Sequence, residues 1–536
     1  MRHINRGVGA AVLAVCLAAT TAACGGSSGG DEAGIAAAAV DGVRIADGAD
    51  GSGADATRLL VASSPVAVVA APDDAAQARA ASVAVGLRAP MLTALPGGGD
   101  ALAAELDRLG VERVLRVGEA DVPAGGRDVV DAPAAREALE DATGISFYDE
   151  LEVPADRVDD VTVHQQPGSP SLLSAGATAG PEEADGEAFT PRAAAWTGDD
   201  APRVLVHDRT PLAAVATAVA SGAAVSHLRA PDPRVDGGSV EAVRDARAVL
   251  ALGPGWGSED ELRDRVEKAR TVPELPGGGQ LLFPGRRFVA AYGSPVTPAL
   301  GILGEQGPAE SAERVRRLVG EYQPFSPEPV LPAFEIIATV ASQSPGPDGN
   351  FTNEWPAGDF VPLIDAITEA GGYAVIDLQP GMADLLDQAR LYEDLLRRPN
   401  VGLALDPEWK LRPGERPGAR IGSADAAEVN RVVHWLADLT RDAGGPQKLL
   451  VLHQFNLAML QNRQDIDTSR PELAITLHAD GHGTPEMKFE TWDILRRDLS
   501  PDIRMAWKNF YDEDTPTFTP EQTMAVTPRP WFVSYQ

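Results

Sequence analysis

Cysteine is nearly absent from this sequence of 536 residues, which has only Cys16 and Cys24. Because both lie close to the N-terminus, internal disulfide bonds are excluded over the rest of the chain. A basic excess is missing as well, since the formal net charge is −32. Nucleic acids and anionic lipid surfaces both require a basic footprint, so neither is an expected partner.

Long apolar runs are scarce too, and the one at residues 8–19 is too short to span a bilayer. It follows Arg2 and Arg6 and precedes small residues that end at Cys24, which is the order of a secretory signal over residues 1–23. The segment at 21–24, Thr-Ala-Ala-Cys, resembles the lipobox of bacterial lipoproteins. That resemblance implies a lipid on Cys24 and a chain tethered to the outer face of the cytoplasmic membrane, in the cell envelope. The alternative is an ordinary signal that is cleaved nearby.

The composition of the exported chain fits this location. Loss of the leader removes two arginines and no acid, so the net charge becomes −34, which favours solubility. Glycine and serine at residues 25–30 are typical of a flexible linker, which we place over residues 24–57. An excess of arginine over lysine, with abundant alanine, is typical of a GC-rich genome and favours an actinobacterial source.

The first half of the chain predicts an α/β domain made of two divergent parallel-sheet repeats. Short apolar runs alternate with helical patterns over residues 58–164 and again over 203–284. Between them, residues 165–202 form a low-complexity insertion. The phrases at 86–93 and 106–114 resemble cell-wall-binding repeats of the second type, which implies attachment to envelope polymers. The alternative is that this half only spaces the second half from the membrane.

The second half, residues 285–536, predicts a TIM barrel. Eight apolar runs are separated by helical patterns within about 250 residues, which is the usual size of that fold. The runs lie at residues 287–292, 334–340, 373–378, 401–405, 448–453, 473–478, 503–508 and 531–535. Helices are expected at 360–370, 382–397, 424–442 and 485–496.

Polar residues gather where these runs end, at the edge that carries the active site of TIM barrels. We therefore expect them to line one pocket that binds a cell-wall or surface polysaccharide. The predicted ligand-binding residues are Tyr292, Gln379, Trp409, His453, Gln454, His478, His482, Lys508, Asn509 and Tyr535.

The candidate catalytic residues are carboxylates. Asp406 and Glu408 stand two residues apart after the fourth run, and a glycosidase needs two such groups. With Asp377 after the third run, they resemble several TIM-barrel glycoside hydrolase families. The resemblance implies Glu408 as the acid and Asp406 or Asp377 as its partner, and Asp480 is a further candidate. Alternatively, Asp406 and Glu408 cap the next helix or pair with Lys410.

Other functions stay open. His478, Asp480 and His482 alternate in a way that could hold a metal and activate water, although we expect no metal and no cofactor. The glycine-rich loop at 253–257 contains Pro254 and Trp256, so a tight turn is favoured over a dinucleotide site. The preferred interpretation is a lipid-anchored glycoside hydrolase. The alternatives are a non-catalytic glycan-binding protein on the same barrel and a metal-dependent hydrolase.

Overall fold

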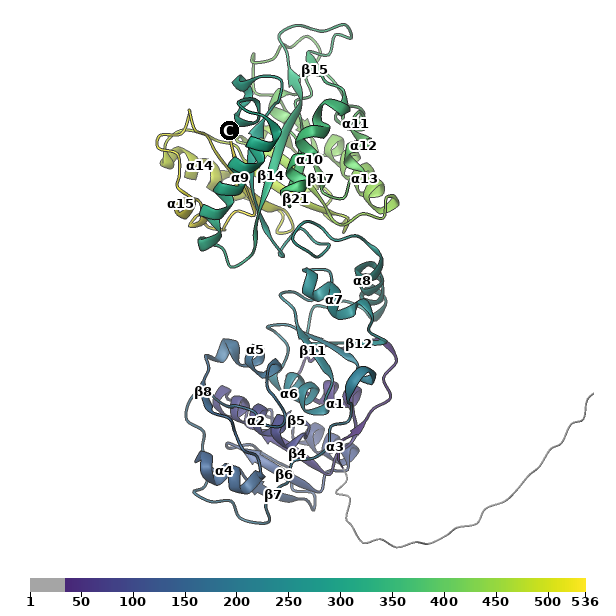
Figure 1. Cartoon of the computed structure of the whole chain (residues 1–536), viewed down its shortest axis with the longest axis vertical. Coiled ribbons are helices and arrows are strands. Elements are labelled where there is room, and N and C mark those ends of the chain that lie inside the picture. The colour runs from purple at the N-terminus through teal and green to yellow at the C-terminus, as the bar shows by residue number, and fades with distance from the viewer. Residues whose placement is uncertain (1–33) are drawn as a thin grey trace, which may run out of the picture. The chain divides into compact units, whose positions relative to one another are not determined.

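The computed structural model describes residues 34–536 (Figure 1). The predicted secretory signal and Cys24 lie outside these described residues. Within residues 34–536 we find no helix that is both long and apolar enough to cross a membrane.

The first α/β repeat contains a four-stranded parallel sheet in the order β5-β4-β6-β7. Its central strand, β4, is buried along its whole length because all five of its residues are apolar. Asp73 begins the following helix by accepting a hydrogen bond from the backbone N–H of Ala76. The strands are β4 (Val66–Ala70), β5 (Met91–Thr93), β6 (Arg113–Val117) and β7 (Asp128–Asp131), and the helices are α2 (Asp74–Leu87), α3 (Gly99–Leu109) and α4 (Arg136–Thr143).

The second repeat has a similar sheet, with the order β11-β10-β12-β2, and all three pairings are parallel. Its fourth strand comes from before the first repeat and takes the place that β7 has in the first sheet. The strands are β2 (Gly42–Ala46), β10 (Arg203–Val206), β11 (Ala224–His227) and β12 (Ala248–Leu252), and the helices are α6 (Leu212–Ser221), α7 (Gly237–Arg244) and α8 (Glu259–Thr271).

Two predicted boundaries in this half need correction. The flexible linker predicted over residues 24–57 contains β2, whose Val43 and Ile45 pack against apolar residues of the second sheet, and most of α1 (Ala54–Leu60) is buried. The insertion at 165–202 contains β9 (Leu172–Ser174), which pairs with β8 (Glu150–Glu152). It also buries Phe189 in the core of the domain, so apolar side chains anchor a segment whose composition is polar.

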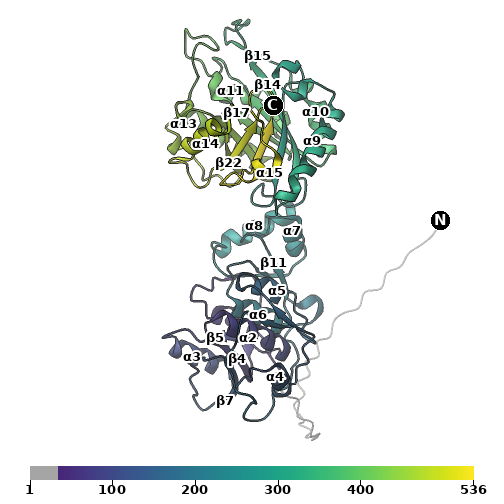
Figure 2. The same cartoon turned by 90° about the vertical axis from the view of Figure 1, so that its left-hand side faces the viewer.

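The second half is a closed barrel of eight parallel strands, as the sequence predicts. Strand β13 pairs with both β14 and β23, which closes the ring. Figure 2 shows the strands in the middle of this half and α9, α10 and α13 around them. The barrel strands are β13 (Arg287–Gly293), β14 (Val330–Ala341), β16 (Tyr373–Leu378), β17 (Val401–Leu405), β19 (Lys448–Gln454), β21 (Leu473–Ala479), β22 (Arg504–Asn509) and β23 (Phe532–Tyr535).

Helices connect most of these strands. The connections contain α9 (Pro308–Tyr322), α10 (Val361–Glu369), α11 (Leu385–Arg390), α12 (Glu393–Leu396), α13 (Ala426–Asp442), α14 (Pro485–Arg496) and α15 (Pro520–Met524). The connection from β19 to β21 contains 3₁₀ turns and the short strand β20 (Leu460–Gln461) in place of an α-helix. Strand β14 is longer than its neighbours, and its end forms an antiparallel pair with β15 (Thr352–Glu354).

Side chains alternate between the inside and the outside of the barrel because successive residues of a strand point to opposite faces. The lower interior is a compact apolar core. Its members include Phe288, Ala290, Ala333, Tyr373, Val375, Ala404, Leu449, Val451, Ala506 and Phe532. The residues between these positions face outward and pack against the helices in a second, larger core. The same alternation places the next inward residue of each strand at the mouth of the barrel.

Candidate active site at the barrel mouth

The top layer of the barrel interior is polar. On the barrel strands other than β21, the next inward-facing residue lies two positions after the last inward-facing residue of the apolar core. These residues are Tyr292, Glu335, Asp377, Asp406, His453, Lys508 and Ser534. His478 lies beside His453, because these two residues are paired in the register of β19 and β21. All eight side chains are buried. Burial of this many ionisable groups is costly unless they pair with one another.

Hydrogen bonds and ion pairs connect this layer, and His453 is at its centre. The Nδ1 atom of His453 lies 2.9 Å from Oδ2 of Asp480, and its Nε2 atom lies 3.0 Å from Oε1 of Glu335. Nε2 is also 3.9 Å from Oδ1 of Asp377. The hydroxyl of Tyr292 donates a hydrogen bond of 2.8 Å to the other oxygen of Asp377.

Lys508 supplies a positive charge to the layer. Its Nζ atom lies 3.0 Å from Oδ1 of Asp480 and 3.7 Å from the centre of the Tyr292 ring. Asp480 therefore lies between the Lys508 ammonium and the His453 imidazole. Burial by itself raises the pKa of Asp480, but these two neighbours hold it well below its usual range.

A cavity of about 400 Å³ opens above this layer. Three candidate catalytic residues line it, namely Asp406, Glu408 and Asp480. The other lining residues include aromatic and polar side chains from several loops. They are Tyr292, Gln379, Trp409, Phe455, His482, Lys508, Phe510 and Gln536, together with Leu300, Ile337, Gly481, Met487 and Thr491.

Polar atoms without partners are present at this cavity. Oδ1 of Asp406 and Nε1 of Trp409 are buried and have no hydrogen-bond partner among the described residues. Unsatisfied buried groups of this kind cost free energy unless a ligand or water binds them. The Asp406 oxygen can accept a hydrogen bond and the Trp409 N–H can donate one. A sugar hydroxyl both donates and accepts, so it can bond to both atoms.

The carboxyl groups at the cavity differ in their ease of ionisation. Burial and the negative charge of Asp480 raise the pKa of Glu408 to about 7. Burial and the nearby Glu408 raise the pKa of Asp406 well above its usual range. Since Asp480 is ion-paired, the cavity combines an ionised carboxylate with a carboxyl group, Glu408, that holds a proton up to about pH 7.

The two buried histidines also differ. Burial lowers the pKa of His453, but the carboxylates of Glu335 and Asp377 more than offset this and raise it well above its usual value. Burial lowers the pKa of His478 to about 4, so its imidazole is neutral. Its Nε2 atom lies 3.1 Å from the hydroxyl oxygen of Ser534.

Five predicted ligand-binding residues do not line the cavity: His453 and His478 lie in the layer below it, and three others, Gln454, Asn509 and Tyr535, point away from it. Gln454 accepts a hydrogen bond from Arg463 at 2.8 Å, Asn509 accepts one from Trp507 at 2.9 Å, and the hydroxyls of Tyr535 and Tyr322 are 2.6 Å apart. Each of the three directly follows an inward-facing residue, so strand alternation turns it toward the helices.

The remaining predicted residues can also be placed. His478, Asp480 and His482 do not form one cluster, because His478 lies below the cavity and the His482 ring packs against Phe510 with centres 5.6 Å apart. Lys410, the alternative partner of Glu408, instead forms an ion pair of 2.8 Å with Glu428.

Sequence reasoning missed Glu335 and Ser534. Glu335 is the only acid within the run at 334–340, and a charged residue inside a predicted buried strand is itself a signal of function. Glu335 does not stand at the end of that run, because β14 continues beyond the barrel mouth to pair with β15. Ser534 lies next to the predicted Tyr535 and faces inward, where it contacts His478.

No protein-family model matches the sequence, and no curated protein matches it. Among solved structures, the chain is similar to Cwp6 from Clostridium difficile, with a TM-score of 0.32 and 11% sequence identity. The match covers 78% of this chain and 63% of that chain, which is less than two thirds of the Cwp6 structure.

Proposed function

We propose that the barrel is a glycoside hydrolase in which Glu408 donates the proton to the leaving group and Asp480 is the second, ionised carboxylate. The observation that carries this proposal is that both carboxyl groups line the same cavity while only Asp480 is paired with a buried cation, Lys508. Hydrolysis of a glycosidic bond requires such a division of roles between two carboxyl groups.

The chemistry follows from the environment of each group. Protonated Glu408 transfers its proton to the glycosidic oxygen as the bond to the anomeric carbon breaks. The positive charge that develops on the sugar ring is then stabilised by the anionic Asp480, either directly or through a covalent ester. Water next adds to the anomeric carbon, releasing Asp480 from any ester, and its proton passes to the Glu408 carboxylate. Lys508 and His453 hold Asp480 in place from two sides, so its carboxylate is fixed before substrate binds.

The walls of the cavity suit a carbohydrate. Trp409, Phe455 and Phe510 offer apolar faces for the C–H surfaces of sugar rings. Gln379 and the unpartnered Trp409 Nε1 and Asp406 Oδ1 atoms offer hydrogen-bonding groups for hydroxyls. This mixture of aromatic and polar groups supports a glycan over a purely apolar ligand.

We further propose an envelope location and an envelope glycan as substrate. The basis is the predicted secretory signal that ends at Cys24, whose lipid would anchor the chain to the membrane. In this proposal the α/β half binds the cell wall or holds the barrel at a distance from the membrane.

The test uses the chain from residue 34 onward and a panel of cell-wall and surface polysaccharides. We expect the unmodified protein to release reducing sugar ends, and Glu408→Gln to lower kcat/KM by about 10²- to 10⁴-fold with binding retained. Glu428→Gln is the control, because that carboxylate lies outside the cavity and pairs with Lys410. Glycan binding by the unmodified protein and Glu408→Gln alike, without turnover by either, would instead establish a lectin-like function.

A further inference from the structure

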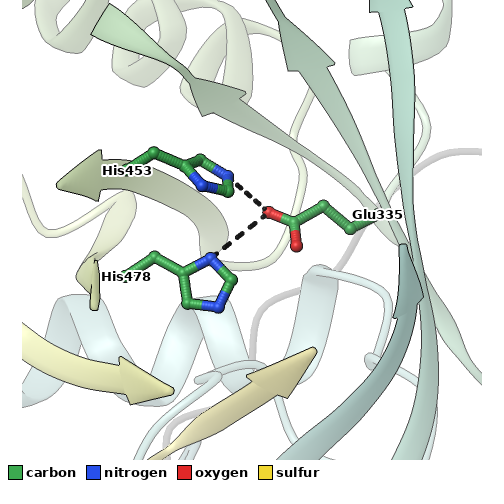
Figure 3. A group of neighbouring side chains, drawn as sticks. All are labelled: Glu335, His453 and His478. Atoms are coloured by element: carbon green, nitrogen blue, oxygen red, sulfur yellow. Dashed lines mark hydrogen bonds and ion pairs between the residues drawn. The ribbon is translucent and has the colours of Figure 1, made fainter. Parts of the chain in front are cut away.

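Below the cavity, Glu335, His453 and His478 form a cluster that the proposed hydrolysis does not use directly. Figure 3 shows the two imidazole rings facing the Glu335 carboxylate from neighbouring strands. Oε1 of Glu335 lies 3.0 Å from Nε2 of His453 and 3.9 Å from Nδ1 of His478. One ligand atom from each residue lies within 4.8 Å of the other two, and all three residues are buried.

These distances suit a bound metal ion. Two ligand atoms about 2.1 Å from a tetrahedral ion lie roughly 3.4 Å from each other. The observed separations of 3.0 and 3.9 Å are on either side of that value. Oδ1 of Asp377 is 3.9 Å from His453 Nε2, so it is placed to provide a fourth ligand.

Several atoms of the cluster lack other partners. Oε2 of Glu335, Oδ1 of Asp377 and Nδ1 of His478 are buried without a hydrogen-bond partner among the described residues. Glu335, Asp377 and His478 have a relative exposure of 0%, so bulk water does not hydrogen-bond to these atoms. The cluster and neighbouring Asp377 thus contribute three buried atoms of ligand type without a partner, which favours a bound species at this place.

The opposite side of each imidazole is held in the manner of a metal ligand. Metal-binding histidines usually hydrogen-bond through their second nitrogen to a carboxylate or another polar group, which fixes the orientation of the ring. Here Nδ1 of His453 bonds to Asp480 at 2.9 Å, and Nε2 of His478 lies 3.1 Å from Ser534.

We propose that Glu335, His453 and His478 bind a divalent first-row transition-metal ion, with Asp377 as the fourth ligand. Two imidazoles with carboxylates favour zinc, iron or manganese over calcium and magnesium, which prefer oxygen ligands alone. Glu335, His453 and His478 do not line the cavity, so the ion would lie beneath the cavity rather than in it. It positions Asp480 through the His453 ring and is not in contact with the substrate.

The test measures metal content rather than activity. The chain is purified from cells grown with added zinc, iron and manganese, and bound metal is measured by mass spectrometry. We expect about one ion per chain, and ligand-field bands of a nitrogen–oxygen site after growth with cobalt. Glu335→Gln and His478→Asn should lose the ion. Ser534→Ala, a small change that should still fold, should weaken metal affinity by about 10- to 100-fold.

The control is His227→Asn. His227 belongs to a second group of possible ligands, with Asp159 and Asp208, in the α/β half. We expect this variant to keep the ion. A purified chain without stoichiometric metal and without cobalt bands would overturn the proposal, as would loss of the ion in His227→Asn with retention in Glu335→Gln. Either result would mean that a protonated His453 holds the cluster together without a metal ion, through its hydrogen bonds to Glu335 and Asp480.

Discussion

Replacing Lys508 with methionine tests whether the charges at the barrel mouth act as one buried network. The Lys508 side chain is 3% exposed, and its Nζ atom is 3.0 Å from Oδ1 of Asp480. At an effective dielectric constant of about 20, two unit charges at this distance attract by roughly 5 to 6 kcal/mol. His453 still bonds to Asp480 in the variant, so part of the compensation remains. We expect Lys508→Met to lower the free energy of unfolding by about 3 to 5 kcal/mol.

The assay is urea unfolding followed by tryptophan fluorescence. Six of the eight tryptophans lie beyond residue 350, so the signal reports mainly on the barrel. Arg397→Met is the control, because Arg397 has a similarly short ion pair of 2.6 Å with Glu393 in the same half of the chain, but at the surface. Solvent screens that pair, and its loss should cost less than about 1 kcal/mol.

The stability cost of Lys508→Met should depend on pH. The pKa of Asp480 is depressed in the folded protein, so its ion pair contributes stability above the usual aspartate range and loses it as the pH falls. In Lys508→Met, Asp480 binds a proton more easily, and the deficit should shrink on acidification. Asp480→Asn in the Lys508→Met background should recover part of the loss. If Lys508→Met lowers the free energy of unfolding by less than about 1 kcal/mol at neutral pH, Lys508 and Asp480 do not form a strong buried ion pair and the argument is refuted.

Three further predictions follow from the same structure. Because Glu408 must be protonated to act as the acid and its pKa is about 7, kcat/KM should fall as the pH rises through that value; a rise would make Glu408 a base. Burial, Asp480 and Asp377 raise this pKa, whereas Lys508 and His453 lower it. Gly402→Ala should destabilise the barrel by about 1 to 3 kcal/mol in thermal or urea unfolding, since its new Cβ would lie 2.6 Å from the Leu449 carbonyl oxygen. Gly320→Ala in α9 meets open space and should stabilise by about 0.5 to 1 kcal/mol, so a loss there would contradict the assigned helix.

Much of the barrel could be predicted from the sequence because its strands are short, apolar and regularly spaced. The predicted ranges 373–378 and 401–405 coincide with β16 and β17. Polar residues at strand ends also led to Asp406, Glu408 and Asp480, which line one cavity. Local patterns carry this information because a buried strand must be apolar until it reaches the rim.

The tertiary structure alone decided which of two neighbouring polar residues faces the interior. His453 and Gln454 are both polar, but only the first points inward, and the same holds for Lys508 and Asn509. The sequence pattern leaves the register of a strand undetermined by one residue, and a shift of one residue reverses every side chain. Glu335 was missed for a related reason, since the rim crosses β14 well before that strand ends.

The N-terminal half illustrates the same division between local pattern and long-range contact. Its alternating runs specified two parallel sheets, because strand and helix periodicities are local properties of the chain. The origin of the fourth strand of the second sheet was beyond local reasoning. β2 pairs with β12, about 200 residues away, and its burial depends on that partner rather than on its own five residues. Composition and periodicity therefore determined the fold class, whereas long-range pairing decided which residues meet in the cores and in the candidate site.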